Sequence, residues 1–319
     1  MNIFYPEAFQ GQGKTRHYFE GWYFKIIDRK AENIMAVIPG ISIEDNAKSS
    51  CFIQVMDANK AESFYLRYAI RKFSYLKNKF QISIGENHFS GDSMTLDISK
   101  DGLEMKGRLE FGELSFWPKS IISPGAMGWY SYIPFMECYH GVISMDHHIS
   151  GELEINGKTI DYNEGKGYIE KDWGRSFPQG WVWAQSNHFS AKKASIMLSV
   201  AKIPFKRFSF TGFICGLMVN DKFYIFATYT GAKIKKIDIS QRQAEICLED
   251  KRHVLNIKTI NSVSATLASP EMGAMGGRIN ESIRAIIEVS LFDKRKGKPI
   301  FTDKSNIGAL EIVNPQVLL

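Results

Sequence analysis

The sequence has few of the residues that build disulfide frameworks or metal centres. It contains only four cysteines in 319 residues, and no two of them form a Cys-x-x-Cys pair. Each lies in an apolar or strand-like segment: Cys51, Cys138, Cys215 and Cys247. We therefore expect buried free thiols. His147-His148 resembles a metal-binding pair, but adjacent strand residues point to opposite faces and no third ligand follows at a suitable spacing. We expect no metal site and no other cofactor.

Long apolar runs are also absent, since no stretch approaches the ~20 residues that a membrane-spanning helix needs. The first residues lack the basic region and the apolar stretch of a signal peptide. These absences predict a cytoplasmic protein and leave peripheral contact with a membrane surface open.

Basic residues are not concentrated, although the net charge is +6. The densest run, Lys294 to Lys298, is typical of a hairpin loop, and one solvated loop is not the basic face that nucleic acids require. We expect no nucleic-acid partner. No serine or cysteine lies in a nucleophile-elbow context, and the glycines at 273, 276 and 277 do not join a strand to a helix. Acyl transfer and phosphate binding are therefore not expected.

What the sequence does contain is aromatic, because 22 Phe, 13 Tyr and 6 Trp make up 13% of the chain. Aromatic residues favour pleated, half-buried strands. Apolar and polar residues alternate in short segments separated by turn residues, as in Tyr18–Ile27, which predicts antiparallel sheet. Asn156-Gly157, between two such segments, predicts a two-residue hairpin turn. A short helix over Lys166–Asp172 stays open as an alternative, because Glu and Lys are good helix formers.

The length favours two domains of about 150 residues each. A poorly periodic stretch, Ser115 to Gly128, contains Pro118 and Pro124 and is the expected crossing between them. We place an N-terminal domain at 1–125 and a C-terminal domain at 126–319, each an antiparallel β-barrel with little helix. The Gly- and Met-rich segment Leu267 to Asn280 is predicted to be a loop over a barrel mouth.

The segment Gly167 to Phe189 carries the clearest functional pattern. If its second part is a strand, alternation places large aromatics and two amides on one face. These residues are Trp181, Trp183, Gln185, Asn187 and Phe189. A buried amide without a partner costs roughly 1–3 kcal/mol, so a plain core strand would prefer aliphatic residues. The mixture is typical of a pocket wall, where apolar area binds and a few polar groups orient a ligand. The alternative is a packed interior with no ligand.

Three carboxylates are candidate acids. The alternation places Glu170 and Asp172 on one face with Tyr168, and Glu20 shares a face with Trp22. A carboxyl group among aromatics has a raised pKa, which would make it a general acid near neutral pH. The alternative is structural: an ion pair of Glu20 or Glu170 with Arg16, Arg175 or Lys171.

These segments together resemble the tocopherol cyclase family. The resemblance rests on Phe19-Glu20-Gly21-Trp22-Tyr23-Phe24-Lys25, Glu170-Lys171-Asp172-Trp173-Gly174, and the alternating run from Trp181 to Phe189. Segments at 266–270 and 306–311 agree with it, so the likeness covers nearly the whole chain in order. It implies a pair of lipocalin-related, calycin-like barrels, with a more distant relation to carotenoid hydratases.

The resemblance also implies a reaction and roles for the residues. Plant and cyanobacterial members close the chromanol ring of tocopherols from prenylated quinols, by protonating an alkene and capturing the cation with the phenol oxygen, without a cofactor. On this basis Asp172 is the first-choice acid, followed by Glu170 and Glu20. Trp22, Trp173, Trp181 and Trp183 would stabilise the cation, and Gln185 and Asn187 would hold the quinol head. Plant members tend to carry Asn in place of Asp172, which keeps two rivals open: an isoprenoid alkene hydratase, and a lipocalin-like carrier of a hydrophobic ligand that performs no chemistry.

Overall fold

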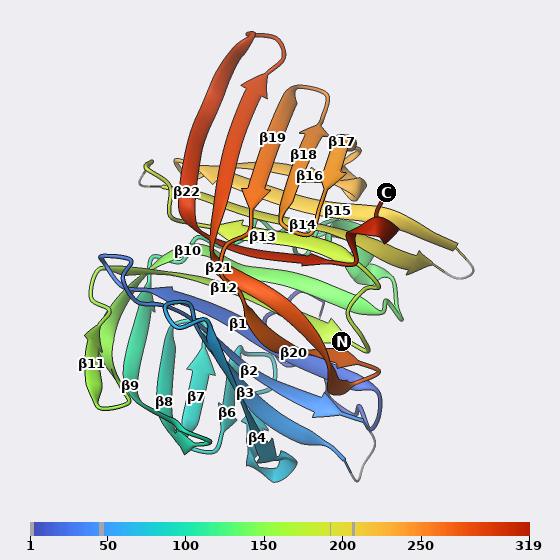
Figure 1. The fold of residues 1–319 in the computed structure, drawn as a ribbon. Helices are drawn as coiled ribbons and strands as arrows, with labels where there is room; N and C mark the ends of the chain where they lie inside the picture. The colour runs from blue at the N-terminus through green and yellow to red at the C-terminus, as the bar shows by residue number, and fades with distance from the viewer. Residues whose placement is uncertain (1–2, 45–47, 192, 206–207) are drawn as a thin grey trace. The chain divides into compact units, whose positions relative to one another are not determined.

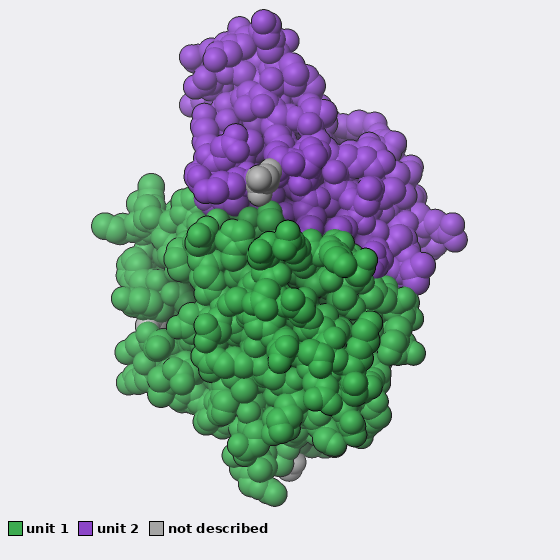
Figure 2. Space-filling model, turned by 90° about the vertical axis from the view of Figure 1, so that its left-hand side faces the viewer, with its two compact units in different colours: residues 1–177, 266–278 green, residues 178–265, 279–319 purple. Residues whose placement is uncertain are grey.

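The computed structural model describes residues 3–44, 48–191, 193–205 and 208–319. The chain forms two compact units (Figures 1 and 2): unit 1 comprises residues 1–177 and 266–278, and unit 2 comprises residues 178–265 and 279–319. Strands dominate, and helix in the described residues is limited to four short 3-10 segments: η1 (Ile70–Lys72), η2 (Gly128–Tyr132), η3 (Thr228–Thr230) and η4 (Pro315–Val317). The predicted mainly β fold is confirmed. Within these same ranges no helix is long and apolar enough to cross a membrane.

The first sheet has twelve antiparallel strands, all in unit 1. Its hydrogen-bonded order is β4 (Glu62–Ala69), β3 (Ser50–Asp57), β2 (Ile34–Ile43), β1 (Tyr18–Ile27), β12 (Gly165–Gly174), β10 (Cys138–Ile155), β9 (Leu103–Gly112), β8 (Ser93–Lys100), β7 (Asn87–Ser90), β6 (Gln81–Ile84) and β5 (Phe73–Tyr75), with β11 (Lys158–Asp161) beside β10. β12 lies between β1 and β10, so Glu20 is paired with Trp173 and Tyr23 with Glu170. Two motifs far apart in the sequence therefore occupy adjacent strands.

The second sheet has ten antiparallel strands. Its order is β16 (Lys222–Ala227), β15 (Phe208–Val219), β14 (Ala194–Phe205), β13 (Trp181–Ser186), β22 (Lys298–Val313), β21 (Ala274–Asp293), β19 (His253–Ile260), β18 (Gln243–Glu249) and β17 (Lys233–Ile239), with β20 (Ala265–Glu271) beside β21. The core of unit 2 is aliphatic, and Val182, Ile196 and Leu198 belong to it.

Local sequence signals place several elements as expected. β1 spans the predicted Tyr18–Ile27. The hairpin between β10 and β11 turns at Asn156 and Gly157, whose φ values of 49° and 78° are those that a two-residue turn of this kind demands. The helix left open over Lys166–Asp172 does not form, because this stretch pairs with β1 on one side and β10 on the other.

Three longer-range expectations differ from the structure. The stretch 115–128 does not separate domains, because β9 and β10, which flank it, pair with each other inside unit 1. The segment 267–280 is not a loop, since it forms β20 and the start of β21. Within the described residues, the pairing gives two large antiparallel sheets with unpaired end strands, β4 and β5 in one and β16 and β17 in the other, rather than closed barrels.

Candidate functional site

The two faces of β12 carry different groups of ionisable side chains. Alternation sends Tyr168, Glu170 and Asp172 to one face, which we call the histidine face after its neighbour His140. It sends Ile169, Lys171 and Trp173 to the other, which we call the lysine face. The predicted separation of Asp172 from Trp173 is therefore observed.

The lysine face contains a fully buried ion pair. The Lys171 ammonium lies 2.6 Å from Glu20 Oε1, and neither side chain is exposed. Lys171 Nζ also donates to the carbonyl oxygens of Pro6 at 2.7 Å and Ala8 at 2.5 Å. Glu20 accepts from the backbone N–H of Gln10 at 2.9 Å, and from the Tyr18 hydroxyl. Every charge here has close partners, as a buried pair requires.

Two of the predicted tryptophans belong to this same arrangement. The Lys171 ammonium lies 4.8 Å from the ring centroid of Trp22 and 4.7 Å from that of Trp173. Their π-faces are therefore already occupied by a resident cation. Burial lowers the pKa of Lys171, and the Glu20 carboxylate opposes that shift. The geometry gives Glu20 the structural role that the sequence left open, with Trp22 and Trp173 as part of its setting.

The histidine face holds a histidine between two carboxylates. His140 of β10 is paired with Asp172. Its Nδ1 lies 2.9 Å from Asp172 Oδ1, and its Nε2 lies 3.5 Å from Glu170 Oε2. Burial alone would disfavour the imidazolium, but the two carboxylates outweigh burial and raise the pKa of His140 to about 9. His140 is therefore charged at neutral pH and donates to Asp172.

Two further donors complete the cluster. The Tyr168 hydroxyl donates to Glu170 Oε2 at 2.5 Å, and the Cys138 thiol lies 3.9 Å from Asp172 Oδ1. Burial, reinforced by the neighbouring carboxylates, holds the pKa of both Tyr168 and Cys138 well above their usual range, so both keep their protons. Glu170 is buried, whereas the Asp172 side chain is 26% exposed. The cluster thus stores protons and presents Asp172 at its accessible edge.

The same cluster is the group of residues most like a metal site in the described ranges. One atom from each of His140, Glu170 and Asp172 lies within 4.8 Å of the others. Both ring nitrogens of His140 face carboxylates, so the same three side chains can share a proton or hold a cation. The absence of a metal stays a prediction.

Sequence reasoning did not single out His140. Its position in the cluster depends on the register between β10 and β12, and two irregularities in that pairing, between Val142 and His147, hide the register from any simple alternation count. The only local signal is a histidine in an otherwise apolar strand start, which by itself is commonplace.

The aromatic face of β13 lies in unit 2. Val182 and Ala184 belong to the core, so Trp181, Trp183 and Gln185 lie on the opposite face, as predicted. Trp181 Nε1 donates to Glu311 Oε2 at 2.5 Å, and Glu311 is the strand partner of Trp183. This partly buried carboxylate contact was not predicted.

The alternation does not continue to Phe189, because β13 ends at Ser186. Asn187 is buried, and its Oδ1 lies 3.1 Å from Nδ1 of His188. Phe189 packs against the core of unit 2 and contacts Phe301 edge-on. It therefore belongs to the packing of that core rather than to the tryptophan face.

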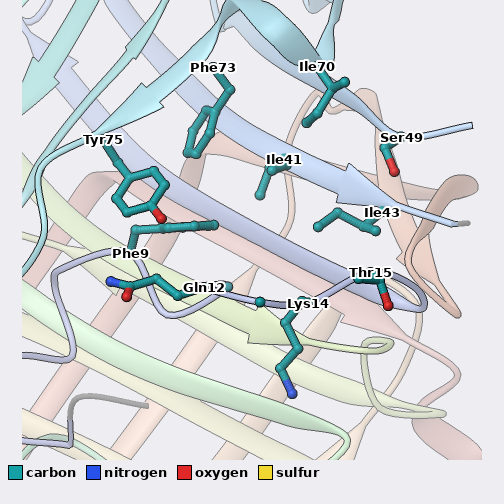
Figure 3. Close-up of a pocket in the computed structure, with 12 residues that line it drawn as sticks. Phe9, Gln12, Lys14, Thr15, Ile41, Ile43, Ser49, Ile70, Phe73 and Tyr75 are labelled. Atoms are coloured by element: carbon teal, nitrogen blue, oxygen red, sulfur yellow. The ribbon is translucent and has the colours of Figure 1, made fainter. Parts of the chain in front are cut away.

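Unit 1 also contains a small pocket of about 370 Å³. Figure 3 shows its apolar side chains, which come from the N-terminal segment, β2, η1 and β5: Phe9, Ile41, Ile43, Ile70, Phe73 and Tyr75. Gln12, Thr15 and Ser49 supply polar groups, and Lys14 points away from the apolar side chains. The pocket has the mixed lining of a small-ligand site.

Comparison with known proteins identifies the family. Residues 108–313 match the tocopherol cyclase-like family, so the chain belongs to that family. A probable chloroplastic tocopherol cyclase from Oryza sativa subsp. japonica is 28% identical over 196 residues, and the chloroplastic tocopherol cyclase from Zea mays is 25% identical over 195. Each match covers 58% of this chain and only 41% of the relative.

Solved structures share the fold at low sequence identity. CghA, solved with Sch210972, is 8% identical with a TM-score of 0.58, covering 93% of this chain and 88% of CghA. Kievitone hydratase from Nectria haematococca is 11% identical with a TM-score of 0.52, covering 97% and 91% respectively. These similarities show the fold alone. The chemistry has to be inferred from the residues of this chain.

Proposed function

We propose that this protein binds a hydrophobic molecule carrying a prenyl alkene and a phenol, and closes a ring between them by protonating the alkene. The supporting observation is the charged His140 held between Asp172 and Glu170 on the histidine face. Family membership supports this choice of reaction class, since two relatives are named tocopherol cyclases.

The reaction needs only the movement of protons. The His140–Asp172 pair holds one proton, which passes from His140 Nδ1 to Asp172; Asp172, at the accessible edge, then delivers it to the less substituted alkene carbon. The tertiary cation is captured by the phenol oxygen, which forms the new C–O bond. The phenol proton released in that step returns to the pair, so product and substrate are isomers.

The surroundings of the pair suit this role. The Tyr168 hydroxyl donates a hydrogen bond to Glu170 and keeps its own proton. Glu170 therefore stabilises the imidazolium of His140, and Asp172 is left to exchange a proton with the substrate. Because the two groups titrate together, the activity should follow the pair rather than one residue. We expect activity to fall as the pH rises through about 9, the pKa of His140.

The tryptophan face of β13 is proposed as an apolar binding surface. Trp181, Trp183 and the amide of Gln185 are buried on the same face, so a ligand bound there would be shielded from water. Replacing Trp183 by Leu should raise KM more than it lowers kcat, whereas a purely structural residue would change the unfolding transition instead.

The decisive experiment compares Asp172→Asn with Glu152→Gln, a control carboxylate exposed on β10. With a prenylated hydroquinone as probe, we expect Asp172→Asn to lower kcat by roughly 100-fold or more while binding persists. The control should keep full activity. Full activity of Asp172→Asn would overturn the assignment.

Two rival functions give other outcomes in the same assay. Water reaches the partly exposed Asp172, so a hydratase would give a product heavier by one water molecule. A carrier would return the isoprenoid unchanged, and the unit 1 pocket favours that reading. In that case Phe73→Ala, in the pocket, should abolish binding and Asp172→Asn should have no effect.

A further inference from the structure

The connection between β9 and β10 exposes an unusual number of large apolar side chains. In the described part of the chain, sixteen large hydrophobic residues are exposed, and eight of them lie in this connection or in the N-terminal segment beside it. They are Phe4, Tyr5, Phe116, Ile121, Ile122, Trp129, Tyr132 and Phe135. We call residues 115–136 the apolar loop. Such a concentration marks an interaction surface.

The apolar loop is also nearly free of charge. Its 22 residues include one charged side chain, Lys119, whereas 23% of the whole chain is charged, which would give about five in such a stretch. A solvated connection normally has the opposite composition. Its partner is therefore apolar.

The tip of the apolar loop is fixed in shape. Ser120 and Ser123 form an isolated antiparallel bridge, with their N–H groups donating to each other's carbonyl oxygens at 2.8 and 3.1 Å. The two residues between them are Ile121 and Ile122, which are 80% and 79% exposed. Two-residue turns usually carry Gly, Asn or Asp, so a β-branched pair here has no local conformational reason.

Two of the aromatic residues are connected to this tip, and a third stacks nearby in the sequence. The Tyr132 hydroxyl donates to the carbonyl of Ile121, and the Phe4 ring meets the Tyr132 ring edge-on at 6.5 Å. Trp129 stacks on Tyr130 at 4.2 Å. Trp and Tyr beside aliphatic residues are the composition of segments that lie at the interface between lipid headgroups and acyl chains.

The apolar loop ends next to the candidate catalytic cluster. The backbone N–H of His140 donates to Met127 Sδ at 3.2 Å, and the Tyr139 hydroxyl donates to the carbonyl of Ile133 at 2.8 Å. These contacts place the end of the apolar loop against the first residues of β10, the strand that carries His140.

We propose that the apolar loop docks this protein on a lipid bilayer by inserting Ile121, Ile122 and the neighbouring aromatics into the interface. The proposal does not depend on the cyclase reaction. Because only one charge is present, insertion and not charge attraction provides the affinity. Binding should therefore occur on uncharged phosphatidylcholine and change little with salt.

The test is cosedimentation of the full chain with phosphatidylcholine vesicles. We expect the wild type to bind and Ile121→Ser/Ile122→Ser to lose roughly tenfold or more in partitioning. The matched control is Phe208→Ser/Val263→Ser, which removes two similarly exposed apolar residues of unit 2 and should bind as the wild type does. A second readout is the quenching of tryptophan fluorescence by brominated lipid. Part of this quenching should disappear in Trp129→Phe.

Other results would overturn the proposal. They are a wild type that does not bind vesicles, an equal loss of vesicle binding in the control variant, or strong binding only to anionic vesicles at low salt. A chain that self-associates in solution through Ile121 and Ile122, without binding vesicles, would identify the partner as a second copy instead. Because vesicle binding is read without turnover, a failed cyclase assay leaves this result intact.

Discussion

Successive residues of β12 send ionisable side chains to two faces of the sheet. One face buries its charges completely, whereas the other leaves one carboxylate partly exposed. On the lysine face, Lys171 and Glu20 have no exposure and every charge has close partners. On the histidine face, His140 shares two carboxylates, one of which reaches solvent. A buried ionisable group is therefore no sign of function by itself. What distinguishes the candidate acid, Asp172, is that its side chain is partly exposed and can pass a proton to a bound molecule.

Breaking the lysine face should have the largest effect on stability. Lys171→Met leaves the Glu20 carboxylate buried without its cation, which we expect to cost about 3–5 kcal/mol in the free energy of unfolding. Urea unfolding measures it. The double variant Glu20→Leu/Lys171→Met should recover part of the loss, because it removes both charges. A loss below about 1 kcal/mol would mean that solvent screens the Lys171–Glu20 pair, as it does at the surface.

The histidines of the two faces should respond to pH in opposite directions. His140, with a pKa raised to about 9, adds stability that is complete below its unfolded pKa of about 6.5 and is lost as the pH rises through 9. His147, on the lysine face, is kept neutral by burial, which lowers its pKa to about 3. Its contribution is complete above about pH 6.5 and is lost as the pH falls toward 3.

Each histidine should change the free energy of unfolding by at most about 1.4 kcal/mol per pH unit within its window. The measurement is urea unfolding from pH 5 to 9.5 of the wild type, His140→Gln and His147→Gln. His140→Gln should flatten the alkaline side only, and His147→Gln the acid side only. The same slope in all three proteins would contradict the comparison.

A smaller effect is expected from filling space on the lysine face. A Cβ at Gly167 would lie 2.1 Å from His147 Nε2, whose ring packs against Phe111. Gly167→Ala should therefore destabilise unit 1 by about 1–3 kcal/mol, as overpacked cores do. Gly112→Ala is the control, since a Cβ there meets nothing within 4 Å. Thermal denaturation compares them, and equal midpoints would show that the face is loosely packed.

The smallest effect should come from an ion pair that neither face contains. Arg29 and Glu164 lie 2.9 Å apart, with side chains 69% and 68% exposed. Solvent screens such pairs, so Arg29→Ala should change the free energy of unfolding by less than about 1 kcal/mol. A change as large as that of Lys171→Met would contradict the expectation that loss of a buried ion-pair partner costs more stability than loss of an exposed one.

The sequence predicts the elements whose signals are local. The alternation of β1, the turn at Asn156-Gly157 and the two faces of β12 and β13 follow from neighbouring residues, and the structure bears them out. All four cysteines are free thiols as expected, but only Cys51 and Cys215 are buried, whereas Cys138 and Cys247 are partly exposed.

What could not be predicted depends on pairing between distant strands. His140 joins the cluster only through the β10–β12 register. Lys171 was one of three candidate partners for Glu20 or Glu170, and only the pairing of β12 with β1 selects it for Glu20. The boundary placed at 125 followed from prolines and glycines in a connection that returns to its own sheet. Phe189 was assigned to the tryptophan face because nothing in the sequence marks the end of β13.

The coordination of Lys171 also has a consequence for how the chain is made. Its ammonium binds the carbonyl oxygens of Pro6 and Ala8, which lie 165 and 163 residues earlier. At ~5–20 residues per second, a ribosome needs roughly 8–30 seconds to bridge that interval. During this time the N-terminal segment and Glu20 have emerged without their cation. The first strand to be synthesised thus pairs early with β2, but its buried carboxylate has no cation until β12 emerges.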